Sequence, residues 1–355
     1  MISKFKTLVF IFWILLNPVI SFGQVPEYYS EIDFTESSDE IKNQLHELIS
    51  DNITFPYTSA STDVWDIIAY SNKHPNNDES LRLIYSGNMK DINCRDGGSS
   101  QYMLEYYKSL EDCSRATSWN REHVYPISNF KYAVDSDDDV YRDTHNIYPI
   151  IMRINSQRSN RKFGVKDKTI SKGYGITQSN AFYPGDDFIG DVARTIMYMY
   201  IRYPDLIVPN LIGEGVIKND IPEIFLLWNQ MDPPDEFETN RNEAIYTFQA
   251  NRNPFIDNPS LATKIWGGPI ITDAWGAINS FEIDIFPNSS STSIEVIKDT
   301  FNDEIIKYQI FDMSGKEVSK GETIQNIDIS YLDNGDYVLK LFIEDYMISK
   351  KIKKI

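Results

Sequence analysis

Apolar residues recur at helical spacing through much of the chain. Ser37 and Glu40 form a capping-box pattern before the run IKNQLHELI, whose spacing predicts an amphipathic helix. TDVWDIIAYSN predicts a second helix, and LRLIYSG predicts a strand that ends in a glycine turn. Pro204 ends a long segment rich in Met and Tyr, as proline ends helices. The remaining helices are expected over residues 186–203, 221–230 and 235–250.

The pattern changes after about Gly268. From Phe281 onward, short runs with strand alternation, such as FEIDIFP, TSIEVIK and GDYVLKLFIE, are separated by Gly, Asn and Asp turns. This spacing predicts a small all-β sandwich. A chain of 355 residues is longer than one hydrophobic core usually serves. We therefore expect an α+β domain over residues 24–275 and a sandwich over residues 281–355.

The first residues have the pattern of a secretory signal peptide, which we place at residues 1–23. Lys4 and Lys6 precede the apolar run LVFIFWILL, and small residues follow at Ser21 and Gly23. The run is short for a bilayer span of roughly 20 apolar residues, so a retained anchor is the weaker alternative. Because no later segment is apolar enough to span a membrane, we expect a soluble protein that is secreted to the exterior or the cell surface.

Cysteine usage and charge narrow the function classes. Export favours a disulfide between Cys94 and Cys113, which would add about 3 kcal/mol if it forms without strain. The net charge of −18 argues against a general polyanion binder, because the far field repels phosphate. The segment from Arg153 to Lys168 is locally basic, against the negative charge of the whole chain. This basic run is either a solvated helix face or a contact for phosphate.

Two runs, HVYP at 123–126 and NIYP at 146–149, each end in proline and predict short edge strands. A segment with helical periodicity follows Pro149, so the local order is strand, long loop, strand, helix. Asn155 is unfavourable inside a helix, because its side chain competes for backbone hydrogen bonds. Its position therefore suggests a functional role.

Glu122 and Asn155 would together offer two oxygen ligands to a hard cation such as Mg²⁺, leaving positions for water and phosphate oxygens. His123 would then accept a proton from the attacking water. Taken alone, a Glu-His pair is more often structural than catalytic. The surrounding sequence is therefore needed to decide between a structural and a catalytic pair.

The wider arrangement reads REHVYP, then D-x-H-N-x-x-P, then N-x-x-R-S-N. It resembles the secreted bacterial endonuclease I family of His-Me finger (ββα-metal) nucleases. The later blocks ARTIMYMYIRYP and FQANRNPFID are similar to that family's carboxy-terminal helices, so the likeness covers roughly residues 65–257. The resemblance implies an α+β fold with a His-Me finger core, and cleavage of DNA, and often RNA, with little sequence preference.

The resemblance also implies roles for individual residues. His123 would be the general base, and Glu122 and Asn155 would hold the cation, expected as Mg²⁺ with Ca²⁺ or Mn²⁺ as alternatives. Arg158 would act beside the reacting phosphate or as a support. The remaining expected site residues are Arg153, Arg161 and Lys162 as nucleic-acid contacts and His145, Asn146 and Asn160 as structural supports.

The last 70 or so residues resemble the C-terminal sorting domain of type IX secretion, on the blocks IFPNSSSTSIEV, YQIFDMSGKEV, ISYLDNGDYVLKL and SKKIKKI. The resemblance implies that the tail is an address read by the secretion machinery and takes no part in catalysis. The alternative is a carbohydrate-binding or adhesive sandwich.

The sequence departs from the family pattern in the connection between the two strands. An arginine that some members use there to stabilise phosphate has no clear counterpart, and Lys131 or Arg142 is the candidate replacement. Neighbours on a regular strand also face opposite sides. Glu122 and His123 can therefore share one phosphate only if the backbone bends there or the strand begins there.

Two further patterns have plain interpretations. Asp135, Asp137 and Asp139 mimic the start of a calcium loop but lack its Gly and Glu, so we expect a solvated loop rather than a weak Ca²⁺ site. His46 and His74 have no partners in the pattern and are expected to be incidental.

Three functions remain from sequence alone. The first is a metal-dependent nuclease, acting as a monomer on DNA and RNA. The second is a catalytically inert nucleic-acid-binding or surface-displayed protein of the same fold. The third is a phosphodiesterase for small esters, which would not need the basic run.

Overall fold

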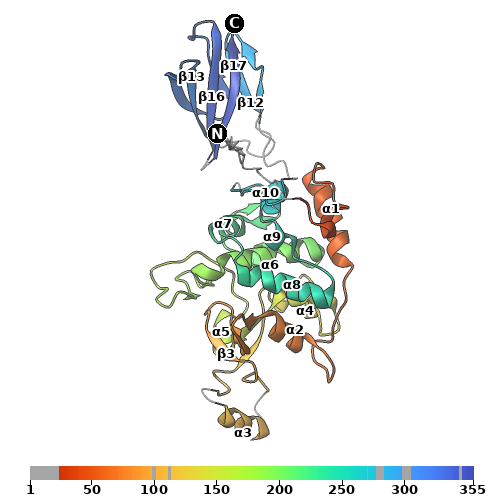
Figure 1. Cartoon of the computed structure of the whole chain (residues 1–355). Helices are drawn as coiled ribbons and strands as arrows, with labels where there is room; N and C mark the ends of the chain where they lie inside the picture. The colour runs from red at the N-terminus through yellow and green to blue at the C-terminus, as the bar shows by residue number, and fades with distance from the viewer. Residues whose placement is uncertain are drawn as a thin grey trace, which may run out of the picture.

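The computed structural model describes residues 24–97, 101–110, 113–269, 271–276, 284–297, 305–343 and 346–355. The expected signal peptide lies outside these residues. The chain forms a helical body around α6 (Ile189–Arg202) and a β-sandwich (Figure 1). Within the described ranges, none of the helices combines the length and the apolar character needed to cross a membrane.

The expected helices are present, with some shifted boundaries. Ser37 caps the first helix and accepts a hydrogen bond from the backbone N–H of Glu40 at 3.3 Å. The helix predicted over 221–230 starts at Glu223, because Ile221 and Pro222 form a short strand and Pro222 stands at the N-cap. The helices of the body are α1 (Ser38–Ser50), α2 (Val64–Ser71), α3 (Gln101–Ser109), α4 (Asp139–Arg142), α5 (Met152–Arg158), α6, α7 (Glu223–Met231), α8 (Glu236–Gln249), α9 (Pro254–Asp257) and α10 (Ser260–Trp266).

A two-stranded antiparallel sheet and one helix build the centre of the site. β4 (Trp119–His123) pairs with β5 (Ile147–Ile151), and α5 follows directly. The prediction for the first strand was wrong in position, because β4 ends at His123 rather than running through Pro126. Ile150 and Ile151 belong to β5 and not to the helix, since Pro149 is tolerated inside this isolated pair of edge strands.

Two other predicted segments end early for backbone reasons. The run LRLIYSG leaves the strand after Arg82, and Tyr85 adopts a φ of 67°, which a strand cannot contain. The basic run is helical only to Arg158, because Ser159 turns the chain with a φ of 51°. The other strands of the body are β1 (Lys73–His74), β2 (Asn77–Arg82), β3 (Met89–Asp91), β6 (Gly175–Ile176), β7 (Phe182–Tyr183), β8 (Ile217–Lys218) and β9 (Ile221–Pro222).

The all-β prediction for the tail is confirmed. Two sheets pack around a separate core that includes Ile294, Ile310 and Leu339, with strand orders β10-β12-β15 and β11-β17-β16-β13-β14. The basic end of the chain is a strand paired with β16. These strands are β10 (Asp284–Phe286), β11 (Ser289–Ser290), β12 (Ser293–Ile297), β13 (Ile306–Asp312), β14 (Glu317–Thr323), β15 (Asn326–Asp328), β16 (Gly335–Ile343) and β17 (Tyr346–Lys354).

The main core of the body surrounds α6, every residue of which is buried. Arg194 of this helix contacts Glu238 at 2.5 Å, and both are fully buried. A disulfide joins Cys94 and Cys113, whose Cα atoms lie 5.8 Å apart, and it closes the loop that carries α3. The body thus holds the β4, β5 and α5 unit against a rigid helical scaffold.

Candidate active site

His123 is the last residue of β4 and is partly exposed. Its Nε2 lies 2.7 Å from the backbone oxygen of Tyr141. Because a carbonyl can only accept, Nε2 carries the hydrogen and Nδ1 keeps the lone pair. The ring is also packed by Tyr57, stacked at 5.8 Å, and by the edge of Tyr141 at 5.1 Å. Burial lowers the pKa of His123 to about 4, so the imidazole is neutral at physiological pH.

Glu122 is almost completely buried, with 2% of its surface exposed. Its Oε1 accepts a hydrogen bond from the hydroxyl of Tyr85 at 2.9 Å and lies 3.2 Å from Nε of Arg158. None of the described residues donates a hydrogen bond to Oε2. Burial raises the pKa of Glu122 to about 7, although the positive charge of Arg158 acts against that shift. The carboxylate therefore has one occupied oxygen and one available oxygen.

Asn155 lies on α5 with its amide oriented by two acceptors. Its Nδ2 donates to the backbone oxygen of Arg121 at 3.0 Å and to Oδ1 of Asn120 at 3.1 Å. This network fixes which end of the amide is the nitrogen. Oδ1 of Asn155 accepts no hydrogen bond from any residue that the structure describes. The otherwise unfavourable helical position thus presents a free amide oxygen.

These three side chains line one open pocket of about 380 Å³, together with Ser128 and Asn160. Glu122 and His123 start on opposite faces of β4, as neighbours on a strand must. Both reach the same opening because β4 ends at His123, where regular alternation stops. The structure therefore brings Glu122, His123 and Asn155 to one site.

The donor set fits a divalent cation. Glu122 and Asn155 line the pocket and each carries one oxygen without a donor among the described residues, and such hard oxygen ligands suit a cation such as Mg²⁺. Across the ranges described above, no three or more His, Cys, Asp or Glu side chains are grouped so that they could hold a metal ion. Two protein oxygens would leave the other coordination positions of a hard cation to water.

Arg158 is fully buried behind Glu122 and is not among the side chains that line the pocket. Its Nη2 donates to the backbone oxygen of Val124 at 2.6 Å, and Nη1 donates to that of Ser159 at 2.8 Å. The guanidinium also lies over Phe163 at 4.5 Å. This placement favours a support for Glu122 over direct contact with phosphate.

The other expected supports lie around this unit. Asn146 is fully buried and bonds both backbone groups of Tyr125, at 2.8 Å and 3.1 Å, which holds the chain beyond β4 against β5. Asn160 lines the pocket and donates to Oγ of Ser128 at 3.2 Å. His145 is buried away from the pocket, with Nε2 3.2 Å from the backbone oxygen of Asn251.

The basic run is only partly available for nucleic acid. Arg153 and Lys162 are exposed, whereas Lys166 pairs with Asp186 at 2.6 Å. Arg161 is half-buried and donates to Oδ1 of Asn180 at 3.1 Å. Only part of the basic run is therefore free to contact a phosphate.

Neither candidate for the missing phosphate-stabilising arginine lines the pocket. Lys131 lies over the ring of Tyr132, and Arg142 pairs with Asp139 at 2.9 Å. The acidic loop is solvated, since Asp135 and Asp137 are exposed and bonded within their own turn.

Sequence reasoning missed the aromatic residues that hold the site. Tyr85 bonds Glu122, and Tyr57 and Tyr141 pack against His123. Tyr85 and Tyr57 are distant in sequence from the motif and occur in segments with no local signal of chemistry. The backbone oxygen of Tyr141 could not have been identified from residue type at all.

Comparison with known proteins agrees with this geometry. The family model described as "Endonuclease I" matches residues 37–260, and the model described as "Secretion system C-terminal sorting domain" matches residues 284–354. The extracellular ribonuclease of Bacillus subtilis (strain 168) is 30% identical over 261 residues, which are 71% of this chain and 82% of the relative. An extracellular deoxyribonuclease of Aeromonas hydrophila is 26% identical over 172 residues, covering 42% of this chain and 71% of the relative.

The match to the family model spans most of the helical body and contains the β4, β5 and α5 unit. The sorting domain coincides with the β-sandwich and implies export through the type IX machinery. The chain therefore belongs to the endonuclease I family, and it is a secreted, metal-dependent endonuclease that acts on nucleic acids.

Proposed function

We propose that the enzyme hydrolyses phosphodiester bonds of both DNA and RNA with little sequence preference, using one Mg²⁺ ion. The observation that carries this proposal is the convergence of Glu122, His123 and Asn155 on a single open pocket. Relatives named as a ribonuclease and as a deoxyribonuclease support a substrate range that includes both polymers. A site that contacts phosphate rather than bases carries no sequence information.

Each residue has one task in this proposal. Nδ1 of His123 accepts the proton of the attacking water, because Nε2 is committed to Tyr141. Oε2 of Glu122 and Oδ1 of Asn155 hold the cation, which when bound neutralises charge on the phosphate and the leaving oxygen. Arg158 and Tyr85 fix the Glu122 carboxylate in place. All these residues come from one chain, so we further propose that the enzyme acts as a monomer.

A cleavage assay of the full exported chain tests the proposal. Duplex DNA, single-stranded DNA and RNA are each incubated with Mg²⁺, Mn²⁺ or Ca²⁺, and with a chelator. We expect cleavage of all three polymers with Mg²⁺, none with chelator, and recovery when Mg²⁺ is restored. Cleavage that persists in chelator would contradict the cation. Cleavage of one polymer alone would contradict the broad substrate range.

The rival activity on small phosphate esters predicts turnover that does not change with salt. The proposed activity on polymers predicts a fall in kcat/KM with rising salt, because phosphate contacts release counterions. A salt series on one polymer and one small diester separates the two.

A further inference from the structure

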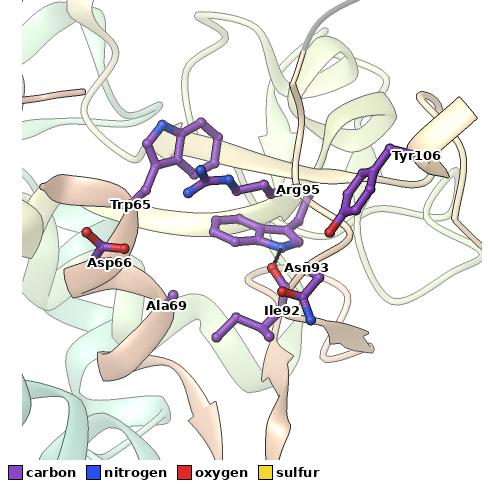
Figure 2. Close-up of a pocket in the computed structure, with 8 residues that line it drawn as sticks. Trp65, Asp66, Ala69, Ile92, Asn93, Arg95 and Tyr106 are labelled. Carbon is purple, nitrogen blue, oxygen red and sulfur yellow. Dashed lines mark hydrogen bonds between the residues drawn. The ribbon is translucent and has the colours of Figure 1, made fainter. Parts of the chain in front are cut away.

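A second pocket, of about 480 Å³, lies on the other end of β4 (Figure 2). Trp119, at the start of β4, forms its floor and is 1% exposed. Trp65 on α2 stands beside it, edge to face at a centroid distance of 5.1 Å. The remaining wall comes from Asn93 and from the loop closed by the disulfide, which carries Arg95 and Tyr106. Trp119 is therefore covered, and the partly exposed rings that a ligand can reach here are those of Trp65 and Tyr106.

The aromatic pocket connects physically to the catalytic pocket. Trp119, Arg121 and His123 occupy alternate positions of β4 and so face one side of the strand. The guanidinium of Arg121 lies 4.2 Å from the Trp65 ring centre and 3.2 Å from that of Tyr57. Tyr57 in turn stacks on His123. An unbroken row of stacked groups therefore runs from the aromatic pocket to His123.

The length of β4 sets the spacing of the two pockets. At a rise of about 3.3 Å per residue, Trp119 and His123 are about 13 Å apart along the strand. Nucleotides in a stacked strand rise about 3.4 Å each, so a strand covers that distance in about four nucleotides, and in fewer when it is extended. One nucleic-acid strand can therefore occupy both pockets at once.

The chemistry of the aromatic pocket favours a base over a phosphate. Its lining includes one acid, Asp66, and one base, Arg95, so their charges offset each other for an incoming anion. Arg95 is exposed and lies over the Trp65 ring at 5.3 Å, so a base would stack on its guanidinium plane or take its place on the ring. Asp66 and Asn93 add hydrogen-bonding groups suited to the amino and ring positions of a base edge. A paired base would have to leave its duplex to enter.

We propose that the aromatic pocket binds one unpaired nucleobase of the substrate strand, a few nucleotides from the scissile phosphate. This inference depends on the proposed nuclease function. Stacking on an aromatic platform tolerates every base, so the subsite adds affinity without strong sequence preference. Single strands and RNA loops are then bound more tightly than regular duplex.

The test pairs a change in the enzyme with a change in the substrate. Single-stranded DNA oligonucleotides carrying one abasic nucleotide at successive positions are cleaved by the full chain in Mg²⁺. The enzyme variants are Tyr106→Ala and Arg95→Gln, and the matched control is Tyr132→Ala, a tyrosine 60% exposed and outside the pocket. Loss of one stacked base is expected to raise KM roughly tenfold at one particular position.

The variants should raise KM for the intact oligonucleotide by a similar factor, and the abasic nucleotide should then add little. Tyr132→Ala should respond to the abasic nucleotide as the wild type does. A KM that no abasic position changes, or variants that respond to the abasic nucleotide as the wild type does, would overturn the subsite.

A binding arm needs no turnover. The His123→Ala chain, with and without Tyr106→Ala, is titrated into fluorescent intact and abasic oligonucleotides, and affinity is read from anisotropy. We expect the intact strand to bind roughly tenfold more tightly than the abasic strand, and Tyr106→Ala to remove this difference. Equal affinity for the two strands before Tyr106→Ala would refute the subsite even if cleavage is normal. A wild-type chain that cleaves no polymer would instead refute the nuclease function.

Discussion

The regions around His123 and His145 perturb the pKa of their histidines alike but differ in how far they expose them. Burial lowers the pKa of both histidines to about 4, and both direct Nε2 at a backbone carbonyl. His123, however, opens on a pocket beside Glu122 and Asn155, whereas His145 is 1% exposed. A perturbed pKa alone therefore does not distinguish His123, the proposed base, from His145, whereas access to the pocket does.

The region around His145 is a buried polar network. Asp143 accepts hydrogen bonds from Tyr198 at 2.7 Å, Tyr203 at 2.9 Å and Gln249 at 3.2 Å. Nδ1 of His145 is buried and, within the described residues, has no hydrogen-bond partner. The pocket beside His123 is instead lined by Glu122 and Asn155, each of which keeps one oxygen without a hydrogen-bond donor among the described residues.

The largest expected difference between the two histidines is in turnover. His123→Ala should lower kcat by roughly 10²- to 10⁴-fold, the usual contribution of a general base, with little change in Tm because the ring is partly exposed. His46→Ala is the control, since its Nδ1 lies 2.8 Å from the backbone oxygen of Ile201 and away from the pocket. Steady-state cleavage and thermal melting give the two readouts. A fall in kcat of less than fivefold would remove His123 as the base.

The next effect concerns the buried pair that joins the catalytic region to the core. Arg158→Leu leaves Glu122 without its partner, and breaking a buried ion pair on one side costs about 3–5 kcal/mol. Arg153→Leu, on the exposed side of the same helix, should change the free energy of unfolding by about 0.5 kcal/mol or less. Urea unfolding measures both. Equal losses in the two variants would show that Arg158 has no special partner.

The pH dependence of the free energy of unfolding tests whether His145 is buried as a neutral ring. Its pKa is about 4 in the folded chain and about 6.5 when unfolded, so between these values the unfolded state binds more protons. The neutral ring therefore adds about 3 kcal/mol to the free energy of unfolding above pH 6.5, and this contribution is lost as the pH falls toward 4. Urea unfolding at several pH values should show a flatter pH dependence for His145→Asn than for the wild type. An unchanged slope would contradict burial of a neutral ring.

The smallest effect is expected at the exposed cations. Arg153→Ala and Lys162→Ala should each reduce the slope of log kcat/KM against log salt by about 1, because each removes one phosphate contact. Lys166→Ala should change the slope less, since Lys166 is paired with Asp186. Cleavage of duplex DNA over a salt series provides the slopes. Identical slopes in all three variants would place the strand elsewhere.

Sequence was sufficient where a local rule decides the structure. Ser37 caps the first helix as its side chain predicts, and the alternating runs of the tail form the expected sandwich. Asn155 was singled out because it is unfavourable in a helix, and the structure shows its amide held by Asn120 and Arg121. A residue that suits its predicted position, such as Ser37, and one that does not, such as Asn155, both gave correct predictions about local structure.

Sequence was insufficient where the structure depends on distant partners. The positive φ of Tyr85 ends the predicted strand and directs its hydroxyl to Glu122, which no local pattern shows. Arg158 was expected either beside the phosphate or as a support, and its contact with Phe163 and its hydrogen bond to the backbone oxygen of Val124, which favour the support, could not be read from the sequence. The stacked row through Arg121 depends on Tyr57 and Trp65, which come from segments far from β4 in sequence. Tertiary contacts, and not residue type, determine these positions.

The central claim is that Glu122 and Asn155 hold one divalent cation beside a histidine that does not bind it. Calorimetric titration of Mn²⁺ into the full chain tests this without any turnover, using the wild type, His123→Ala, Glu122→Gln and Asn155→Leu. We predict one ion per chain, unchanged affinity in His123→Ala, and affinity lower by roughly 10- to 100-fold in the other two variants. Wild-type affinity in both Glu122→Gln and Asn155→Leu would contradict the claim.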